Sequence, residues 1–169
     1  MRLNCLTDAY ADLWTDVYDD AWRDDSWAYL WNNLPPLGDV RPAWERNTPL
    51  RTECARRAAL VEIDALVAVW LGMDVDALIA IYQAAFPVLN RYEEITWFDA
   101  NGSKLAGYHR TYGQYQKKET WEQFQSYLED PSNNPPPDGY KPPFYKADRI
   151  GEYRQAHAAF TERMKGAAS

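Results

Sequence analysis

The architecture of this chain follows from residues 48–74, which read TPLRTECARRAALVEIDALVAVWLGMD. Thr48-Pro49 is typical of a helix start, because a hydroxyl that can cap the first turn precedes proline at the first helical position. Apolar residues then recur at helical spacing to about Leu71, and Gly72 follows in the position that commonly ends a helix. We therefore predict one long helix between these signals. The side chains that it is predicted to bury are Ile63, Leu66, Val67 and Trp70.

An amphipathic helix is also predicted upstream, over Tyr10 to Trp22. Its aromatic and aliphatic residues recur three, four, seven and eight positions apart, and Thr7 stands where it can cap the first turn. A short helical continuation is predicted from Ser26 to Trp31. Residues 35–49 hold four prolines and one glycine, so we predict an irregular connection there.

The next helix is predicted to begin after Asp74, which can cap it, and to break at Phe86-Pro87. The hydrophobic period then changes to that of strands at residues 95–98 and 104–106. These segments flank Asn101-Gly102, the dipeptide best suited to a two-residue turn with positive φ, so we expect one small β-hairpin. The helix that follows Asp74 is predicted to bury Leu78, Ile81 and Tyr82.

Two more helices are predicted toward the C-terminus. Thr120 and Gln123 form a capping box before a helical pattern that ends near Leu128. Residues 130–143 hold six prolines, which predicts a loop. Asp148 can cap the last helix. The apolar residues in register in that helix are Ile150, Tyr153, Phe160 and Met164.

These patterns predict a mainly α protein, an irregular helical bundle with one small β-hairpin at about residues 95–108. The chain has 169 residues, of which 46 % are hydrophobic and 15 % aromatic, so it can bury a core and is expected to form one domain, 1–169. The predicted parts of this domain are acidic N-terminal helices at 1–34, central helices at 48–94, a hairpin and basic loop at 95–118, and a helix, proline-rich loop and C-terminal helix at 119–169.

A soluble, cytoplasmic protein is expected, with no membrane partner. The first seven residues lack the apolar segment of a secretory leader. The longest apolar run, Ala65 to Met73, is about half as long as a membrane span. Cys5 and Cys54 are the only cysteines, which favours free thiols in a reducing compartment.

The charge is distributed unevenly along the chain. The net charge is −7, and seven aspartates lie within the first 25 residues. No Asp or Glu occurs between Ala100 and Lys118, where basic side chains alternate with tyrosines, a mixture that can stack on bases and contact phosphates. The alternative is a solvated loop whose tyrosines pack on the core, and the negative charge of the whole chain favours it. The candidate nucleic-acid contacts are Lys104, Tyr108, Arg110, Tyr112, Tyr115, Lys117 and Lys118.

No catalytic or metal-binding residue is predicted. The sequence contains no nucleophile elbow and no glycine-rich phosphate loop. The adjacent acids Glu93-Glu94 are expected to face water. The cysteines and histidines, none of which has the close spacing of metal ligands, are Cys5, Cys54, His109 and His157.

Three segments carry a likeness to a known family. They are Leu3–Thr7 with Tyr10–Trp14; Glu62–Ala68 through Ile81-Tyr82 and Phe86-Pro87 to Trp97–Gly102; and Pro143-Phe144 through Asp148-Arg149 to Tyr153-Arg154 and Ala158–Phe160. Together they resemble the C-terminal end of large restriction-type DNA adenine methyltransferases, including those of the BREX and phage growth limitation defence systems. The likeness spans nearly this whole chain but only the last part of such a protein.

Members of that family transfer a methyl group from S-adenosylmethionine to adenine, using a glycine-rich cofactor motif and an Asn-Pro-Pro-aromatic motif. This chain has no glycine-rich motif, and at Asn134 to Pro137 a proline stands where the aromatic residue belongs. The resemblance therefore implies no catalytic residue and no cofactor in this chain, and S-adenosylmethionine is expected only in the parent protein.

The resemblance implies a non-catalytic accessory domain next to the target-recognition region. Such a domain braces the DNA-reading region or docks a partner, so the expected partners are the remainder of a larger methyltransferase, its defence-system subunits, and duplex DNA. The alternative is a stand-alone acidic protein-interaction module, an antitoxin-like or DNA-mimic inhibitor whose N-terminal aspartates imitate phosphates.

Overall fold

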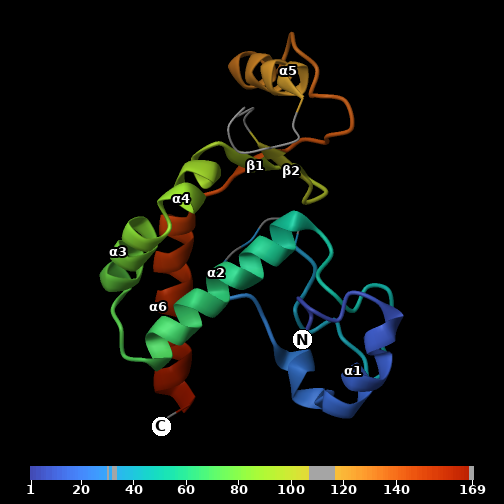
Figure 1. Cartoon of the computed structure of the whole chain (residues 1–169), viewed down its shortest axis with the longest axis vertical. Helices are drawn as coiled ribbons and strands as arrows, with labels where there is room; N and C mark the ends of the chain where they lie inside the picture. The colour runs from blue at the N-terminus through green and yellow to red at the C-terminus, as the bar shows by residue number, and fades with distance from the viewer. Residues whose placement is uncertain (30, 32–33, 107–116, 168–169) are drawn as a thin grey trace.

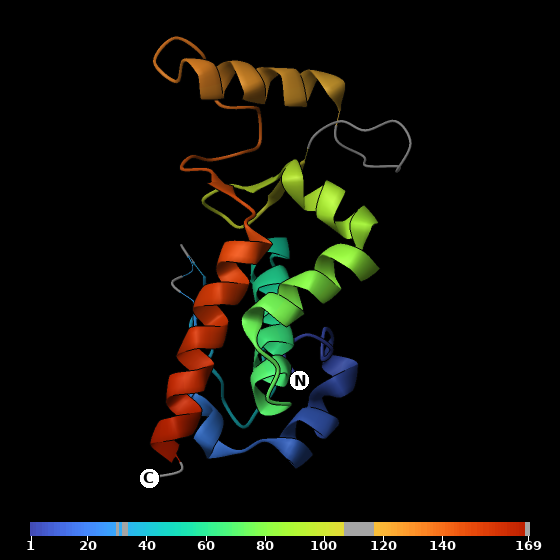
Figure 2. The same cartoon turned by 90° about the vertical axis from the view of Figure 1, so that its left-hand side faces the viewer.

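The computed structural model of the chain describes residues 1–29, 31, 34–106 and 117–167. This part contains six α-helices and a small three-stranded antiparallel sheet, which confirms the prediction of a mainly α fold. Two long helices, α2 (Glu53–Trp70) and α6 (Arg149–Ala167), lie side by side at the centre (Figures 1 and 2). The sheet and α5 (Lys118–Glu129) lie toward one end of this pair, and the N-terminal segment lies toward the other.

In the core between α2 and α6, Val61 and Ala65 of α2 pack in one cluster with Tyr153 and Ala156 of α6. Ala55, Ala58, Ala65 and Ala68 of α2 are buried, as is Ala156 of α6. Alanines let two helix backbones come close, because the distance between helix axes depends on the side chains at the contact. α3 (Val75–Ala85) packs beside them. The central core cluster consists of Val61, Ala65, Ile79, Tyr82, Tyr153 and Ala156.

The predicted buried face of α2 is wrong. Ile63, Leu66 and Val67 are exposed, and Trp70 is 75 % exposed. The C-terminal half of α2 is apolar on every side, so its hydrophobic period alone does not select a face. The alanine-rich side packs against α6, and this contact turns the larger side chains outward.

The start of α2 also differs from the prediction. The helix begins at Glu53, where Thr52 caps it by accepting a hydrogen bond from the Ala55 N–H (3.2 Å). Thr48 is buried outside the helix, and its carbonyl accepts a hydrogen bond from the Arg2 guanidinium (2.7 Å). Contact with the N-terminus therefore keeps Thr48 out of the helix. The predicted helix end is confirmed, since the residue after Leu71 is a glycine with a φ of +69°.

The predicted helix over Tyr10 to Trp22 is interrupted, and Thr7 makes no side-chain cap. The chain leaves helical geometry at Tyr18, and the Asp19 carboxylate then caps the next turn by accepting a hydrogen bond from the Ala21 N–H (2.9 Å). The elements found there are a 3-10 turn at Asp8–Tyr10, α1 (Ala11–Val17) and a second 3-10 turn at Asp20–Asp24.

Tertiary packing explains this interruption. Trp14 is fully buried and donates its indole N–H to the Arg41 carbonyl (2.8 Å). Its ring packs edge-on against Trp22, with the centroids 5.4 Å apart, and Val40 belongs to the same small core. The break brings both tryptophans onto residues 35–49, which are irregular as predicted.

The predicted helical continuation from Ser26 to Trp31 is also wrong for the residues that are described. The Glu62 side chain, buried in α2, instead accepts hydrogen bonds from the backbone N–H groups of Ala28 (2.8 Å) and Tyr29 (2.9 Å). It also accepts one from the Trp31 indole (3.0 Å). A single carboxylate therefore holds this segment against the helices.

Asp74 caps α3 as predicted, by accepting a backbone hydrogen bond in the first turn (2.8 Å). Phe86-Pro87 ends α3, but the proline also begins α4 (Pro87–Glu94), which was not predicted. Proline suits a first helical position because no N–H is needed there. Tyr82 is buried and Leu78 partly buried, whereas Ile81 is exposed, contrary to the prediction.

β1 (Thr96–Phe98) and β2 (Lys104–Ala106) form the predicted hairpin, but its loop is longer than two residues. Gly102, with a φ of +76°, donates its N–H to the carbonyl three positions earlier (2.9 Å). This geometry suits a three-residue loop with glycine in the left-handed position. β3 (Tyr145–Lys146) was not predicted and pairs with β1, so the strand order is β2-β1-β3. Residues 107–108 of the predicted hairpin lie outside the described residues.

α5 begins two residues before Thr120, so the predicted capping box lies inside the helix. Its buried Phe124 packs edge-on against Trp97 of the sheet, with ring centroids 5.4 Å apart. Residues 130–143 form a loop, as predicted. Asp148 caps α6, as predicted, by accepting a hydrogen bond in its first turn (3.1 Å). Of the four apolar residues predicted to be in register in α6, Tyr153 is buried, Ile150 and Phe160 are partly buried, and Met164 is exposed.

Candidate docking surface

The structure describes three of the candidate nucleic-acid contacts. Lys104 lies in β2, whereas Lys117 and Lys118 are exposed at the start of α5. Lys118 forms an exposed ion pair with Glu122 (3.1 Å), a kind of contact that contributes little to stability. The remaining candidates, which lie outside the described residues, are Tyr108, Arg110, Tyr112 and Tyr115.

The described residues do not bring the thiols and imidazoles together. Cys5 and Cys54 are free and buried, and burial raises the pKa of the Cys54 thiol to about 11. His157 makes a hydrogen bond with the Met73 carbonyl (2.8 Å). Among the residues with assigned positions, no group of three His, Cys, Asp or Glu side chains is placed to hold a metal ion. Within the same ranges, no helix is long and apolar enough to cross a membrane.

A buried ion cluster joins α2, α4 and α6. Arg149 on α6 donates to both carboxylate oxygens of Glu93 on α4, at 2.8 to 3.0 Å. Arg57 on α2 donates to the same carboxylate (2.9 and 3.0 Å) and forms an ion pair with Glu152 on α6 (2.6 Å). Asp64 on α2 forms an ion pair with Arg149 (3.3 Å). These five residues are called the ion cluster below.

The expectation that Glu93 faces water is wrong. Burial by itself raises the pKa of this carboxyl, but hydrogen bonds and charges from Arg149 and Arg57 outweigh burial, and the pKa lies below its ordinary value. Burial lowers the pKa of Arg149, but its contacts with Glu93 outweigh that effect and raise it. Burial also raises the pKa of Glu152, against the opposing charge of Arg57. Glu93 and Arg149 therefore stay ionised near neutral pH and hold the helices together.

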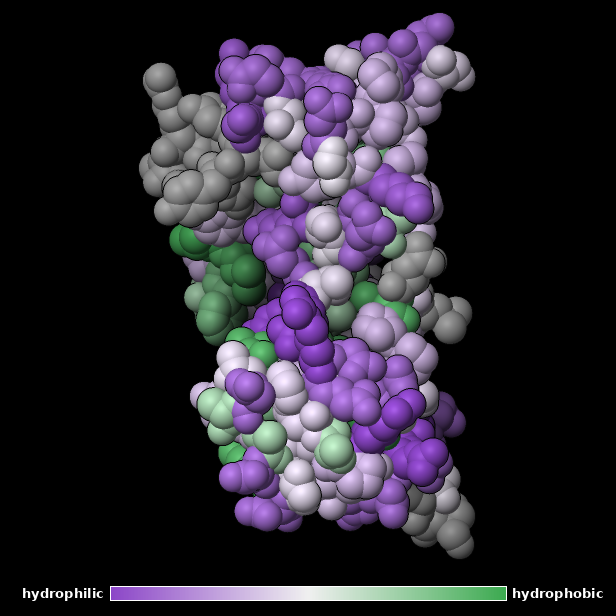
Figure 3. All heavy atoms as spheres, turned by 90° about the vertical axis from the view of Figure 1, so that its right-hand side faces the viewer, coloured by the Kyte–Doolittle hydropathy of each residue, from purple (hydrophilic) through white to green (hydrophobic). Residues whose placement is uncertain are grey.

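The outer face of α2 is apolar and exposed. Trp70 and Leu71 expose 75 % and 66 % of their surface. Helices that are apolar all round are normally buried, and large contiguous apolar patches commonly mark interaction sites. On the side shown in Figure 3, the most strongly hydrophobic residues lie mainly along one edge, and smaller hydrophobic areas are scattered among hydrophilic and neutral residues elsewhere. The residues of the outer face are Leu60, Ile63, Leu66, Val67, Trp70 and Leu71.

An apolar groove of about 490 Å³ adjoins the outer face, between α2 and the α3–α4 pair, with α6 residues in its lining. Its walls are aliphatic and aromatic, and the charged residues in its lining are Asp64 and Arg149. An apolar groove with few polar groups is the usual form of a binding site. The lining residues are Leu60, Asp64, Val67, Ala68, Leu71, Met73, Leu78, Ile81, Tyr82, Phe86, Leu89, Arg149 and Tyr153.

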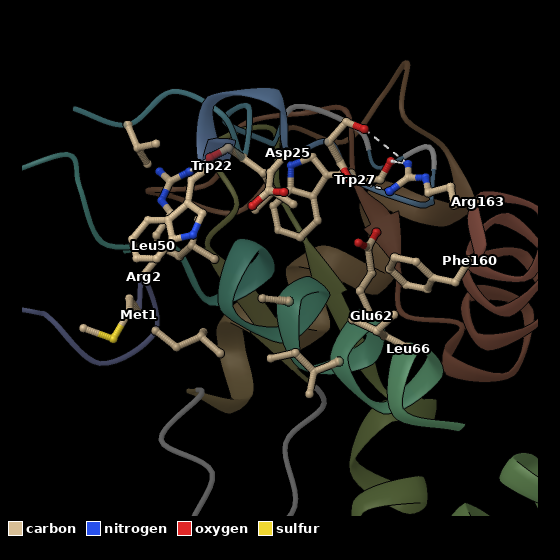
Figure 4. Close-up of a pocket in the computed structure, with 16 residues that line it drawn as sticks. Met1, Arg2, Trp22, Asp25, Trp27, Leu50, Glu62, Leu66, Phe160 and Arg163 are labelled. Atoms are coloured by element: carbon tan, nitrogen blue, oxygen red, sulfur yellow. Dashed lines mark hydrogen bonds between the residues drawn. The ribbon is translucent and has the colours of Figure 1, made fainter. Parts of the chain in front are cut away.

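A second hollow, of about 460 Å³, lies between α2, the N-terminal segment and α6. Figure 4 shows Glu62 pointing from α2 toward Trp27, with Phe160 and Arg163 approaching from α6. Arg163 donates to the Trp27 carbonyl (2.9 Å), and Glu62 holds the residues that follow Trp27. Two polar side chains of this hollow, Glu62 and Arg163, therefore attach the N-terminal segment to the helices.

No protein-family model, no curated protein and no solved structure matches this chain. The likeness to the C-terminal end of DNA adenine methyltransferases therefore stays a prediction carried by the residues alone. The geometry of the outer face and the groove provides the further basis for a functional proposal.

Neither the outer face nor the ion cluster was predicted from the sequence. The outer face could have been found from the apolar residues between Leu60 and Leu71, which cover every side of a helix when placed on a 3.6-residue period. The ion cluster has no comparable local signal, because Glu93 and Arg149 are 56 positions apart in sequence.

Proposed function

We propose that this chain is a non-catalytic docking domain of a restriction-modification or phage-defence DNA methyltransferase. In this proposal, the outer face of α2 and the adjoining groove bind an amphipathic helix from the target-recognition region. The resemblance supports the identity of the parent protein, and the exposed apolar surface supports the mode of binding. S-adenosylmethionine binds elsewhere in the parent protein.

The proposal rests on one observation, the exposure of six large apolar side chains on the outer face of a central helix. Burying one such side chain contributes about 1.5–3 kcal/mol, although association and ordering offset much of that gain. A helix that lies in a groove binds through apolar residues at i, i+3, i+4 and i+7. The groove wall from Leu60 to Leu71 is about 16 Å long at 1.5 Å per residue, which matches three turns of a partner helix.

The ion cluster supports a structural role for the charged groups near the groove. Arg149 and Glu93 are buried and bonded to each other, and together they join α4 to α6. Within such a buried pair each charge compensates the other, and removing either partner is strongly destabilising. The proposed function therefore assigns recognition to the apolar walls and no reaction to this chain.

The alternative, an acidic module that imitates DNA, has less support. All seven N-terminal aspartates are exposed. They are distributed over α1, two 3-10 turns and the residues next to them, so they do not lie on one continuous helix with regular spacing. Phosphates repeat at regular intervals along DNA, and an interrupted helix does not favour such a regular repeat of carboxylates.

Site-specific photo-crosslinking in source cells tests the proposal. A photoreactive residue replaces Leu71 in the groove wall, and the matched control replaces Asp16 on the acidic side. We expect the Leu71 position to crosslink to the target-recognition region of a DNA methyltransferase, while the Asp16 position does not. Crosslinking from Asp16 alone, to a basic protein, would support the acidic module. Crosslinks from Leu71 only to a second copy of this chain would contradict docking to a methyltransferase.

A further inference from the structure

Asp64 provides the accessible charge in the apolar groove. The groove is also lined by Arg149, but this side chain is only 7 % exposed and donates to Glu93 (2.8 Å) and to the Tyr153 hydroxyl (2.9 Å). The Asp64 side chain is 46 % exposed. A molecule that enters the groove therefore meets the Asp64 carboxylate between apolar walls.

Both internal contacts of Asp64 fall on the same oxygen. Oδ2 accepts hydrogen bonds from the Tyr153 hydroxyl (2.7 Å) and from Arg149 (3.3 Å). Oδ1 makes no hydrogen bond or ion pair with any residue that the structure describes. One carboxylate oxygen is thus available to a donor from outside the chain.

The ion cluster is not neutral. It contains two guanidinium groups, Arg57 and Arg149, and three carboxylates. When all five groups are ionised, the cluster carries one unbalanced negative charge, and Asp64 is its most exposed member. A purely apolar partner that covered Asp64 would remove this charge from water without a counter-charge, which is unfavourable.

We infer that the partner helix places one lysine or arginine opposite Asp64, with apolar residues one turn before and one turn after it. This inference rests on the proposed docking function and specifies the chemistry of the occupant. Asp64 lies between the groove residues Leu60 and Val67 on α2. The basic residue of the partner helix therefore lies in the middle of that helix's apolar stripe. The net charge of −7 also favours a basic partner, through long-range attraction.

Three synthetic helical peptides test the inference. Each has about 18 residues, or five turns, with the same stripe of leucines, and they differ only in a central arginine, methionine or glutamate. Binding to the full chain is measured by calorimetry at low and high salt. We expect the arginine peptide to bind about fivefold more tightly than the methionine peptide at low salt, and the glutamate peptide to bind most weakly. High salt should reduce the advantage of arginine, because it screens a partly exposed ion pair.

Two variants of the chain separate charge from apolar contact. Asp64→Asn keeps an oxygen that can accept from Tyr153 but removes the charge, so it should abolish the preference for arginine, by weakening the arginine peptide and by strengthening the methionine peptide, which no longer buries an unpaired charge. Leu71→Ala should weaken all three peptides alike. Equal binding of the arginine and methionine peptides would overturn the inference and leave the docking function intact. Binding of none of the peptides would overturn helix docking in this groove.

Discussion

Glu93 is the single residue on which the contacts among α2, α4 and α6 most depend. It accepts hydrogen bonds from both Arg57 and Arg149 in the interior. Removing a charge from water costs several kcal/mol, and this cost is offset only while its partners remain in place. Loss of Glu93 therefore leaves the buried guanidinium groups of Arg57 and Arg149 with less negative charge to balance them.

We expect Glu93→Gln to lower the free energy of unfolding by about 3–5 kcal/mol, because the amide cannot balance the two guanidinium charges. The matched control is Glu94→Gln, at the exposed neighbouring position, with an expected change within about 0.5 kcal/mol. Urea unfolding followed by tryptophan fluorescence provides both values. Equal stability of the two variants would show that the ion cluster does not hold the helices.

The free energy of unfolding of Glu93→Gln should depend on pH less strongly than that of the wild type in acid. Because the folded-state pKa of Glu93 is lowered, its stabilising contribution is complete above the ordinary value of 4.5 and is lost as the pH falls through the folded value. Glu152 acts in the opposite direction, since its pKa is raised and its contribution is lost as the pH rises through that value. Glu93→Gln should therefore lose less stability than the wild type on acidification below 4.5.

Helix α2 combines two surfaces that serve different contacts. One side, with the buried Ala65, packs in the core shared with α6, and the outer face presents larger apolar side chains to the surroundings. A close contact tolerates little added volume, because protein interiors are packed as densely as organic crystals. The two surfaces should therefore respond in opposite ways to substitution in the isolated chain.

We expect Ala65→Leu to lower the free energy of unfolding by about 1–3 kcal/mol, because the added atoms force α2 and α6 apart. Trp70→Ala removes many more atoms, but from an exposed position, so the expected change is within about 0.5 kcal/mol. Thermal unfolding followed by circular dichroism gives this comparison. A larger loss for Trp70→Ala than for Ala65→Leu would mean that the outer face is buried within the chain itself.

At the level of the whole molecule, the N-terminal segment is attached to the helices partly by polar anchors. Glu62 holds residues 28, 29 and 31, and Arg163 donates to the Ser26 carbonyl (3.1 Å). Arg2 donates to the Leu37 carbonyl (2.8 Å), which fixes the irregular connection. A segment held by a few such contacts can open locally while the helices stay folded.

We expect Glu62→Ala to increase the rate of proteolytic cleavage in the N-terminal segment by about tenfold or more, because three N–H donors lose their acceptor. All three hydrogen bonds fall on one oxygen, Oε1, so Glu62→Gln can retain them and should be cleaved at nearly the wild-type rate. Limited proteolysis with mass spectrometry measures the sites and rates, and circular dichroism verifies the helices. An unchanged cleavage rate in Glu62→Ala would exclude this anchor.

Local signals in the sequence determined much of the architecture. The mainly α class, the caps at Asp74 and Asp148, the end of α2 at Gly72 and the hairpin around Gly102 were all predicted. Each of these features depends on a few consecutive residues, such as a capping carboxylate or a glycine with positive φ. For the candidate site, the sequence contained the apolar residues of α2 but did not say which of them face outward.

Only the tertiary structure decided which face of α2 is buried, how Glu93 and Arg149 are paired, and where the third strand lies. An apolar pattern on every side of a helix is compatible with several packings, and the fit of the alanines against α6 selects one of them. Glu93 and Arg149 meet across 56 positions, so no local period connects them. Long-range packing removes these charges from water and leaves Asp64 and the outer face accessible, and this arrangement creates the candidate docking surface.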